Sequence, residues 1–126
     1  MLRKFDVVAL KTDNEKIFHH FCIKTDIVNI ITFDLTRKLP FRLKPKLIKE
    51  ALKRNIHFEL CYSPAIAGKT AHHTHLDLYF VDLTKRKYVM ANANSIMQVT
   101  RGNGIILSSG CYQAIYHRSP HDLVML

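Results

Sequence analysis

The sequence has few cysteines and no long hydrophobic run, and each absence excludes a class of protein. Its three cysteines, Cys22, Cys61 and Cys111, are widely spaced among apolar residues, and no C-x-x-C pair is present. An odd, scattered set predicts reduced core thiols of an intracellular protein, not a disulfide framework or a zinc site. No stretch approaches the ~20 apolar residues of a membrane span, and the N-terminus has no apolar signal-peptide core. We therefore expect a soluble nuclear or cytosolic protein without a membrane partner.

Acidic residues are scarce as well. Ten Asp and Glu stand against 19 Lys and Arg, which gives a net charge of +9 and a pI near 9.7. The eight His add further positive charge at lower pH. This balance favours a polyanionic partner, with nucleic acid ahead of a membrane surface. The alternative that charge alone leaves open is a basic domain that is merely soluble.

Apolar runs and helical patterns alternate along the chain. Four runs are typical of buried parallel strands: Phe5–Leu10, Asp26–Phe33, His57–Tyr62 and Ile105–Ser109. The first helix follows a capping-box pattern, in which Thr12 precedes Glu15 by three residues. A later helix from Lys85 to Thr100 places an apolar set on one face: Val89, Ala93, Ile96, Met97 and Thr100. Gly102 is placed to end that helix, and Ser119-Pro120 predicts the start of a last one.

The central stretch from Leu39 to Ile66 joins a basic loop, an amphipathic helix and a short strand. The apolar face of the helix is formed by four residues at helical spacing: Leu47, Ile48, Ala51 and Leu52. Asn55 follows this pattern and is predicted to adopt the left-handed conformation at the helix end. Pro64 cannot donate to a ladder, so the strand must stop before it.

The order strand–helix, repeated four times, predicts an α/β fold with a parallel sheet. A chain of 126 residues is one domain or part of one. A closed barrel of eight such units needs ~200 residues or more, so four units predict either a small open sheet or an incomplete barrel. A strand close to Met1 and a short last helix favour a segment of something larger.

Short motifs occur along the chain in a defined order. The most specific are LPF at residues 39–41 and FEL-x-YSPAI at 58–66. The others are FDVVA at 5–9, NEKIF at 14–18, DIV at 26–28 and IILSS at 105–109. At this separation they resemble the thirty-kilodalton protein subunit family shared by ribonuclease P and ribonuclease MRP.

The resemblance implies a TIM-barrel-like fold similar to the polymerase-and-histidinol-phosphatase metal hydrolases, without their metal site. By the same resemblance, we expect residues 1–126 to form a single partial TIM-barrel-like domain. It also implies a non-catalytic RNA-binding subunit that supports RNA-catalysed removal of the 5′ leader from precursor tRNA, and pre-rRNA processing in ribonuclease MRP. The expected partners are the ribonuclease P or MRP RNA, precursor tRNA and other protein subunits, including a small RNA-binding one. The expected location is the nucleus, in particular the nucleolus. No cofactor is expected on this chain, and Mg would serve the catalytic RNA.

The chain departs from the family pattern in two places. It resembles the middle of that pattern and lacks its first strands and final helices. Residues 67–81 look inserted, because the family passes quickly from the SPAI turn to the next helix, here beginning near Thr84. We expect this segment to be a lineage-specific loop or the product of an imperfect gene model.

Basic residues cluster around the loop that precedes the central helix. The candidates for RNA binding there are Arg37, Lys38, Arg42, Lys44 and Lys46. A loop that leaves the carboxyl end of a barrel strand lies on the face that usually carries function, and cations there would neutralise phosphates. A second group lies at the start of the following helix: Lys85, Arg86 and Lys87. Positive charges there oppose the helix dipole, and a bound anion would relieve this repulsion. The alternative for the loop group is a solvated basic face.

The segment HHTHLD at residues 72–77 offers a different function. His73, His75 and Asp77 have the residue types of the metal ligands in amidohydrolase-type barrels. The segment has no regular period, and no other strand end supplies a clear set of His and carboxylate groups. We therefore interpret it as a solvated loop and predict no catalytic residue and no metal site. A metal-dependent hydrolase of the related barrel class remains the alternative.

Overall fold

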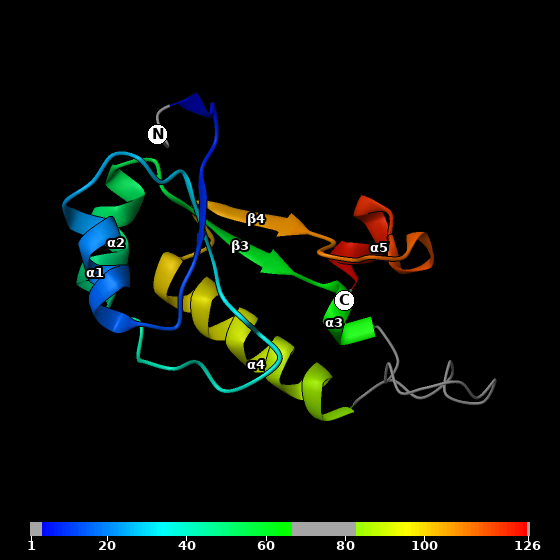
Figure 1. The fold of residues 1–126 in the computed structure, drawn as a ribbon. Coiled ribbons are helices and arrows are strands. Elements are labelled where there is room, and N and C mark those ends of the chain that lie inside the picture. The colour runs from blue at the N-terminus through cyan, green and yellow to red at the C-terminus, as the bar shows by residue number, and fades with distance from the viewer. Residues whose placement is uncertain (1–3, 67–82, 126) are drawn as a thin grey trace.

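The computed structural model describes residues 4–66 and 83–125, which form a four-stranded parallel sheet with helices between the strands (Figure 1). The strands lie in chain order: β1 (Ala9–Lys11), β2 (Ile30–Thr32), β3 (His57–Cys61) and β4 (Ile105–Ser108). The helices are α1 (Glu15–Ile23), α2 (Pro45–Lys53), α3 (Ser63–Ile66), α4 (Leu83–Thr100) and α5 (Pro120–Val124), with a 3-10 turn at Ala114–Tyr116. The predicted α/β fold of parallel βα units is confirmed. The sheet is open, as in an incomplete TIM-barrel-like unit.

Two predictions from the sequence concern an inserted loop and the lack of a membrane span. The inserted loop predicted at residues 67–81 lies outside the described residues. Among the helices that the structure describes, none is long and apolar enough to cross a membrane.

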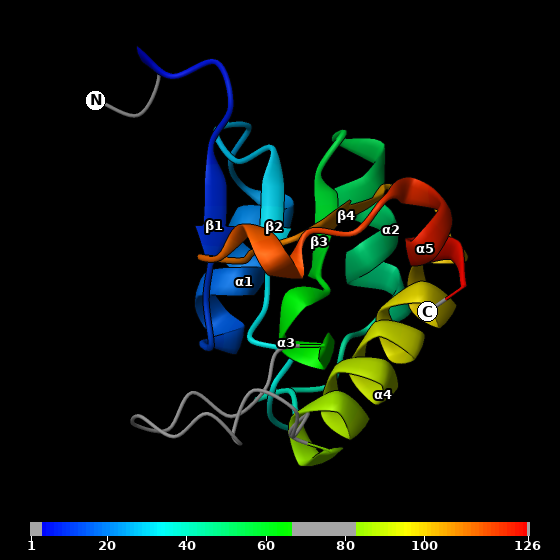
Figure 2. The same cartoon turned by 90° about the vertical axis from the view of Figure 1, so that its right-hand side faces the viewer.

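The register of the strands gives the sheet one apolar face and one mixed face. One row of aligned residues is wholly apolar: Leu10, Ile31, Phe58 and Ile105. The next row, which points to the opposite face because side chains alternate, contains Lys11, Thr32, Glu59 and Ile106. Helices α1 and α2 lie behind the strands in Figure 2, on the apolar side. This is the arrangement in which crossover helices cover one face of a parallel sheet.

The core extends from the sheet to α1, α2 and α4. Its largest fully buried side chains include Phe18, Ile31, Ile48, Ile56, Phe58 and Ile96. Burial of one such side chain contributes roughly 1.5–3 kcal/mol. The core therefore fixes the positions of the three long helices against the sheet.

The first two strands are shorter than the apolar runs predicted. Phe5 and Val7 are 66% and 61% exposed, and β1 begins only at Ala9. The side-chain oxygen of Asn29 accepts a hydrogen bond of 2.9 Å from the backbone N–H of Val8, and the Asn29 N–H donates to the Val8 carbonyl. A side-chain bond here replaces regular ladder pairing. The predicted strands were therefore wrong at their N-terminal ends.

The helix ends follow the sequence signals with one correction. Asn14, not Thr12, caps α1, because the Asn14 side chain accepts hydrogen bonds from two backbone N–H groups of the first turn. The Thr12 hydroxyl oxygen instead accepts a bond from the Asn14 N–H. Asn55, with φ 57°, has the predicted left-handed conformation after α2. Gly102, with φ 74°, follows the end of α4 as expected.

Candidate nucleic-acid interface

The basic loop, residues 34–44, joins β2 to α2 and passes beside α4 (Figure 1). A buried amide attaches it to the helix. Nδ2 of Asn92 donates to the carbonyl oxygens of Leu35 and Arg37, at 3.0 and 2.7 Å. The sequence placed Met97 in the buried stripe of α4 and left out Asn92, yet Met97 is 49% exposed and Asn92 only 7% exposed. The signal for Asn92 is its helical spacing, three residues after Val89 and four before Ile96.

Arg37 is held by carboxylates that follow the first two strands. Its guanidinium pairs with Asp13 at 2.7 Å and with Asp34 at 3.1 Å. Partial burial of Asp34 raises its pKa, but hydrogen bonds from the side chain and backbone of Thr36, together with the charges of Arg37 and Lys11, lower the pKa overall. Asp34 is thus a carboxylate that fixes the start of the loop. Arg37 contributes to loop structure more than to an open cationic surface.

Phe41 packs the far part of the basic loop against the core. Its ring lies 5.2 Å from that of Phe18 and 6.1 Å from that of Phe33, measured between ring centroids. Leu43, two residues on, is buried. Aromatic contacts of this kind add about 0.5–1.5 kcal/mol per pair beyond the area buried. The loop is therefore held at its start by the ion pairs of Arg37 and in its far part by Phe41 and Leu43.

The other four cations predicted around the loop do not share one environment. Lys44 pairs with Glu15 of α1 at 2.8 Å. Lys46 is exposed and lines a separate, mainly apolar hollow between α1 and α2, beside His19 and Ile23. Lys38 and Arg42 are exposed, and neither forms an ion pair with any residue in the ranges 4–66 and 83–125.

Lys38 and Arg42 line one groove between the basic loop and α4. The groove has a volume of about 450 Å³, within the range of small-molecule sites. The loop side is formed by residues 38–43, and the helix side by Asn92, Ser95, Gln98 and Val99. Cations thus stand beside apolar walls and exposed hydroxyl and amide groups. This is the composition that suits a ligand with both phosphates and an aromatic or apolar part.

The second predicted cation group does not join this groove. Lys85, Arg86 and Lys87 are exposed in the first turns of α4. Arg86 lies about 18 Å along the helix axis from Gln98, at 1.5 Å rise per residue. The structure therefore places these three cations on the same helix as the groove, but at its other end.

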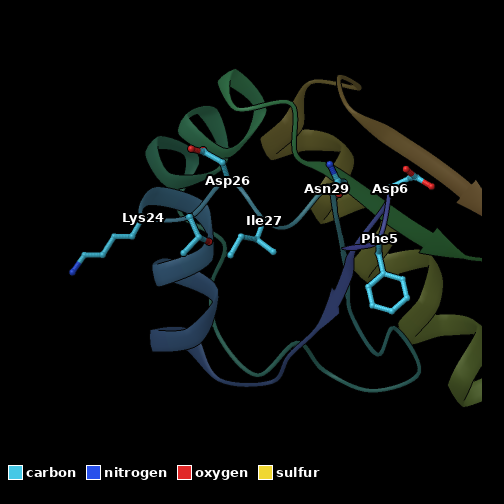
Figure 3. A pocket seen from close by; sticks show the side chains of 7 residues that line it. Phe5, Asp6, Lys24, Asp26, Ile27 and Asn29 are labelled. Atoms are coloured by element: carbon cyan, nitrogen blue, oxygen red, sulfur yellow. The ribbon is translucent and has the colours of Figure 1, made fainter. Parts of the chain in front are cut away.

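The hollow drawn in Figure 3 has a different charge. It lies at the amino ends of β1 and β2 and is lined by residues that include Asp6, Lys24, Asp26 and Asn29. Asp26 also pairs with Arg54 of the α2 C-cap. The carboxylates of Asp6 and Asp26 make this hollow a poorer match for a polyanion than the groove at Lys38 and Arg42.

The predicted alternative metal ligands cannot be placed. His73, His75 and Asp77 lie outside the described residues, so the absence of a metal site stays a prediction. Within residues 4–66 and 83–125, no group of three or more His, Cys, Asp or Glu side chains is arranged to hold a metal ion.

Comparisons with known proteins cover the whole chain. The profile of the family described as RNase P subunit p30 matches residues 1–126. Ribonuclease P protein subunit p30 of Mus musculus is 34% identical over 125 residues, which are 99% of this chain and 41% of the mouse protein. Probable ribonuclease P protein subunit 3 of Schizosaccharomyces pombe is 27% identical over 124 residues, 98% of this chain and 46% of its own. Ribonuclease P/MRP protein subunit RPP1 of Saccharomyces cerevisiae is 26% identical over 115 residues, 91% of this chain and 34% of its own.

The chain spans less than half the length of these three relatives. The family match nevertheless extends from the first residue to the last. The resemblance read from the short motifs is thereby confirmed. The chain belongs to the RNase P subunit p30 family.

Proposed function

We propose that this chain is a non-catalytic RNA-binding subunit of a ribonuclease P or ribonuclease MRP complex. The relatives' names support the subunit role. The observation that supports RNA binding is the pair Lys38 and Arg42 on one groove, exposed and without an ion-pair partner among the described residues. In the complex, the RNA would carry out removal of the 5′ leader from precursor tRNA, or pre-rRNA processing in ribonuclease MRP.

The electrostatic argument separates these two cations from their neighbours. A cation that neutralises a phosphate releases condensed counterions, which is the main source of affinity for nucleic acid. Arg37 and Lys44 already contact carboxylates, so a phosphate would have to compete with Asp13, Asp34 or Glu15. Lys38 and Arg42 meet no such competition from the described residues. They are therefore the first candidates for phosphate contact.

The proposal extends to the surroundings of the chain. We place the subunit in the nucleus, in particular the nucleolus, with the ribonuclease P or MRP RNA and other protein subunits as partners, including a small RNA-binding one. No cofactor is assigned to the chain, and Mg would serve the catalytic RNA. The net charge of +9 fits a partner that is itself polyanionic.

The test is binding of the purified chain to ribonuclease P RNA, compared between two charge-reversal variants. Lys38→Glu with Arg42→Glu should weaken binding at least tenfold, because two phosphate contacts become repulsive. Lys16→Glu with Lys49→Glu changes the net charge equally on the exposed surfaces of α1 and α2 and is the control. Equal losses in both variants would contradict the assignment of the groove.

A further inference from the structure

We infer that the groove between the basic loop and α4 binds an unpaired nucleotide, with its base in the groove and its flanking phosphates on Lys38 and Arg42. This inference rests on the proposed function and adds the class of RNA that the site selects. It follows from the walls of the groove, which differ from those of a plain phosphate-binding surface.

The loop wall combines charge with apolar carbon. Lys38 and Arg42 flank Leu39, Pro40 and Phe41, and all five residues line the groove. Phe41 is fixed from behind by the rings of Phe18 and Phe33. An aromatic base inserted here would cover apolar surface while its phosphates reached the cations on either side of it.

The helix wall carries hydrogen-bonding groups. Ser95 and Gln98 are exposed on α4 and line the groove opposite the loop. The Ser95 hydroxyl donates to the Ala91 carbonyl at 2.9 Å, so its oxygen remains an acceptor. The Gln98 amide offers both donors and an acceptor. These groups match the exposed edge of a base that has no pairing partner.

Double-stranded RNA does not fit this set of groups. In a duplex the bases are stacked and paired, so only phosphates, riboses and groove edges reach a protein surface. Lys38 and Arg42 would still meet phosphates, but the apolar walls and the Gln98 amide would be left without a partner. An unpaired nucleotide can fill all of these positions together. The groove therefore favours loops, bulges and single-stranded ends.

The groove is also held in shape before any ligand binds. The Asn92 amide ties the loop carbonyls to α4, and Arg37 ties the start of the loop to two carboxylates. Loop ordering on binding normally reduces affinity, and these internal contacts remove much of that cost. Arg37 and Asn92 are thus positioning residues for this site.

The experiment measures fluorescence anisotropy of the whole chain with an oligouridylate of about 12 nucleotides and with an RNA duplex of about 12 base pairs. Ser95→Leu fills the groove with a larger side chain. It leaves the charge unchanged, and leucine has a higher helix propensity than serine. Asn94→Leu, the adjacent exposed residue that does not line the groove, is the matched control. We expect Ser95→Leu to weaken oligouridylate binding about 5- to 150-fold, the range for loss of one stacked base, and to leave duplex binding unchanged.

A second groove variant, Gln98→Leu, provides an independent test in case Ser95→Leu misfolds. It should likewise weaken binding of the oligouridylate and leave binding of the duplex unchanged. Equal affinities of Ser95→Leu, Gln98→Leu and Asn94→Leu for oligouridylate would overturn the inference. The charge reversals at Lys38 and Arg42 separate the two proposals. If they abolish binding of both RNAs while the groove variants change nothing, only the inference fails. If they leave both RNAs bound, the proposed function fails as well.

Discussion

Replacement of Lys38 and Arg42 by alanine should change how RNA affinity responds to salt. Each phosphate contact with single-stranded RNA contributes about −0.7 to the slope of log affinity against log salt concentration. Removing two contacts should therefore make the slope about 1.4 less steep. Between about 50 and 200 mM salt, the native chain should lose roughly seven times more affinity than the double variant.

A matched variant tests whether the partners of each cation matter. Arg37→Ala with Lys44→Ala also removes two positive charges, so its net charge equals that of the Lys38 and Arg42 variant. Because both residues contact carboxylates, at 2.7 and 2.8 Å, we expect the salt slope to stay within about 0.7 of the native value. Affinity itself should fall modestly, since Asp13 and Glu15 are unmasked.

The free energy of unfolding should also distinguish the two double variants, but here the Arg37 and Lys44 variant should show the larger change. Exposed ion pairs contribute about 0–1 kcal/mol each, so loss of Arg37 and Lys44 should lower the free energy of unfolding slightly. Loss of Lys38 and Arg42 should leave it unchanged, since neither has an ion-pair partner in the described parts of the chain. The assays are anisotropy titrations at four salt concentrations and urea unfolding. Identical slopes for the two double variants would show that net charge alone determines binding, and would refute this reasoning.

Further predictions concern the loop, the cysteines and the alternative function. Asn92→Ala should lower the free energy of unfolding in urea by about 1–3 kcal/mol, because two loop carbonyls lose their donor, whereas Asn94→Ala should not. The pKa of Asp34 is lowered in the folded chain, so its contribution is complete above the unfolded value of about 3.9 and is lost as the pH falls through the folded pKa. Asp34→Asn should accordingly flatten the acid side of the stability profile; an unchanged profile would count against the Thr36 and Arg37 contacts. Burial raises the pKa of Cys22 to about 12 against a smaller opposing effect of Arg54, so thiol reagents at neutral pH should modify Cys22 only after unfolding. Elemental analysis should find no stoichiometric zinc or manganese; bound metal that disappears in His73→Ala with His75→Ala would favour the hydrolase alternative.

The alternation of strands and helices was accessible from the sequence because it depends on local pattern. The stripe of four predicted residues determines which face of α2 is buried: Leu47, Ile48 and Ala51 are buried, and Leu52 is half-buried against the core. Asn55 has the predicted left-handed conformation for an equally local reason. The ends of β1 and β2 were less predictable. Asn29 bonds to Val8, 21 residues earlier, and a contact of that length leaves no periodic signal.

The basic cluster was visible in the sequence, but the roles of its members were not. Arg37 pairs with Asp13 across 24 residues, and Lys44 pairs with Glu15 across 29. Only the fold brings these partners together. Asn92 was missed because a polar residue within a helix is usually exposed, and its acceptor at Leu35 lies 57 residues away. The sequence could therefore indicate a cationic surface, whereas the groove and its two available cations required the structure.

The most direct test of RNA binding at the groove is photo-crosslinking of the whole chain to ribonuclease P RNA, followed by mass-spectrometric identification of the attached peptides. The account predicts that crosslinks concentrate in residues 38–43 and 95–99, the two walls of the groove. Crosslinks confined to the outer surfaces of α1 and α2, with both groove walls unmodified, would contradict it.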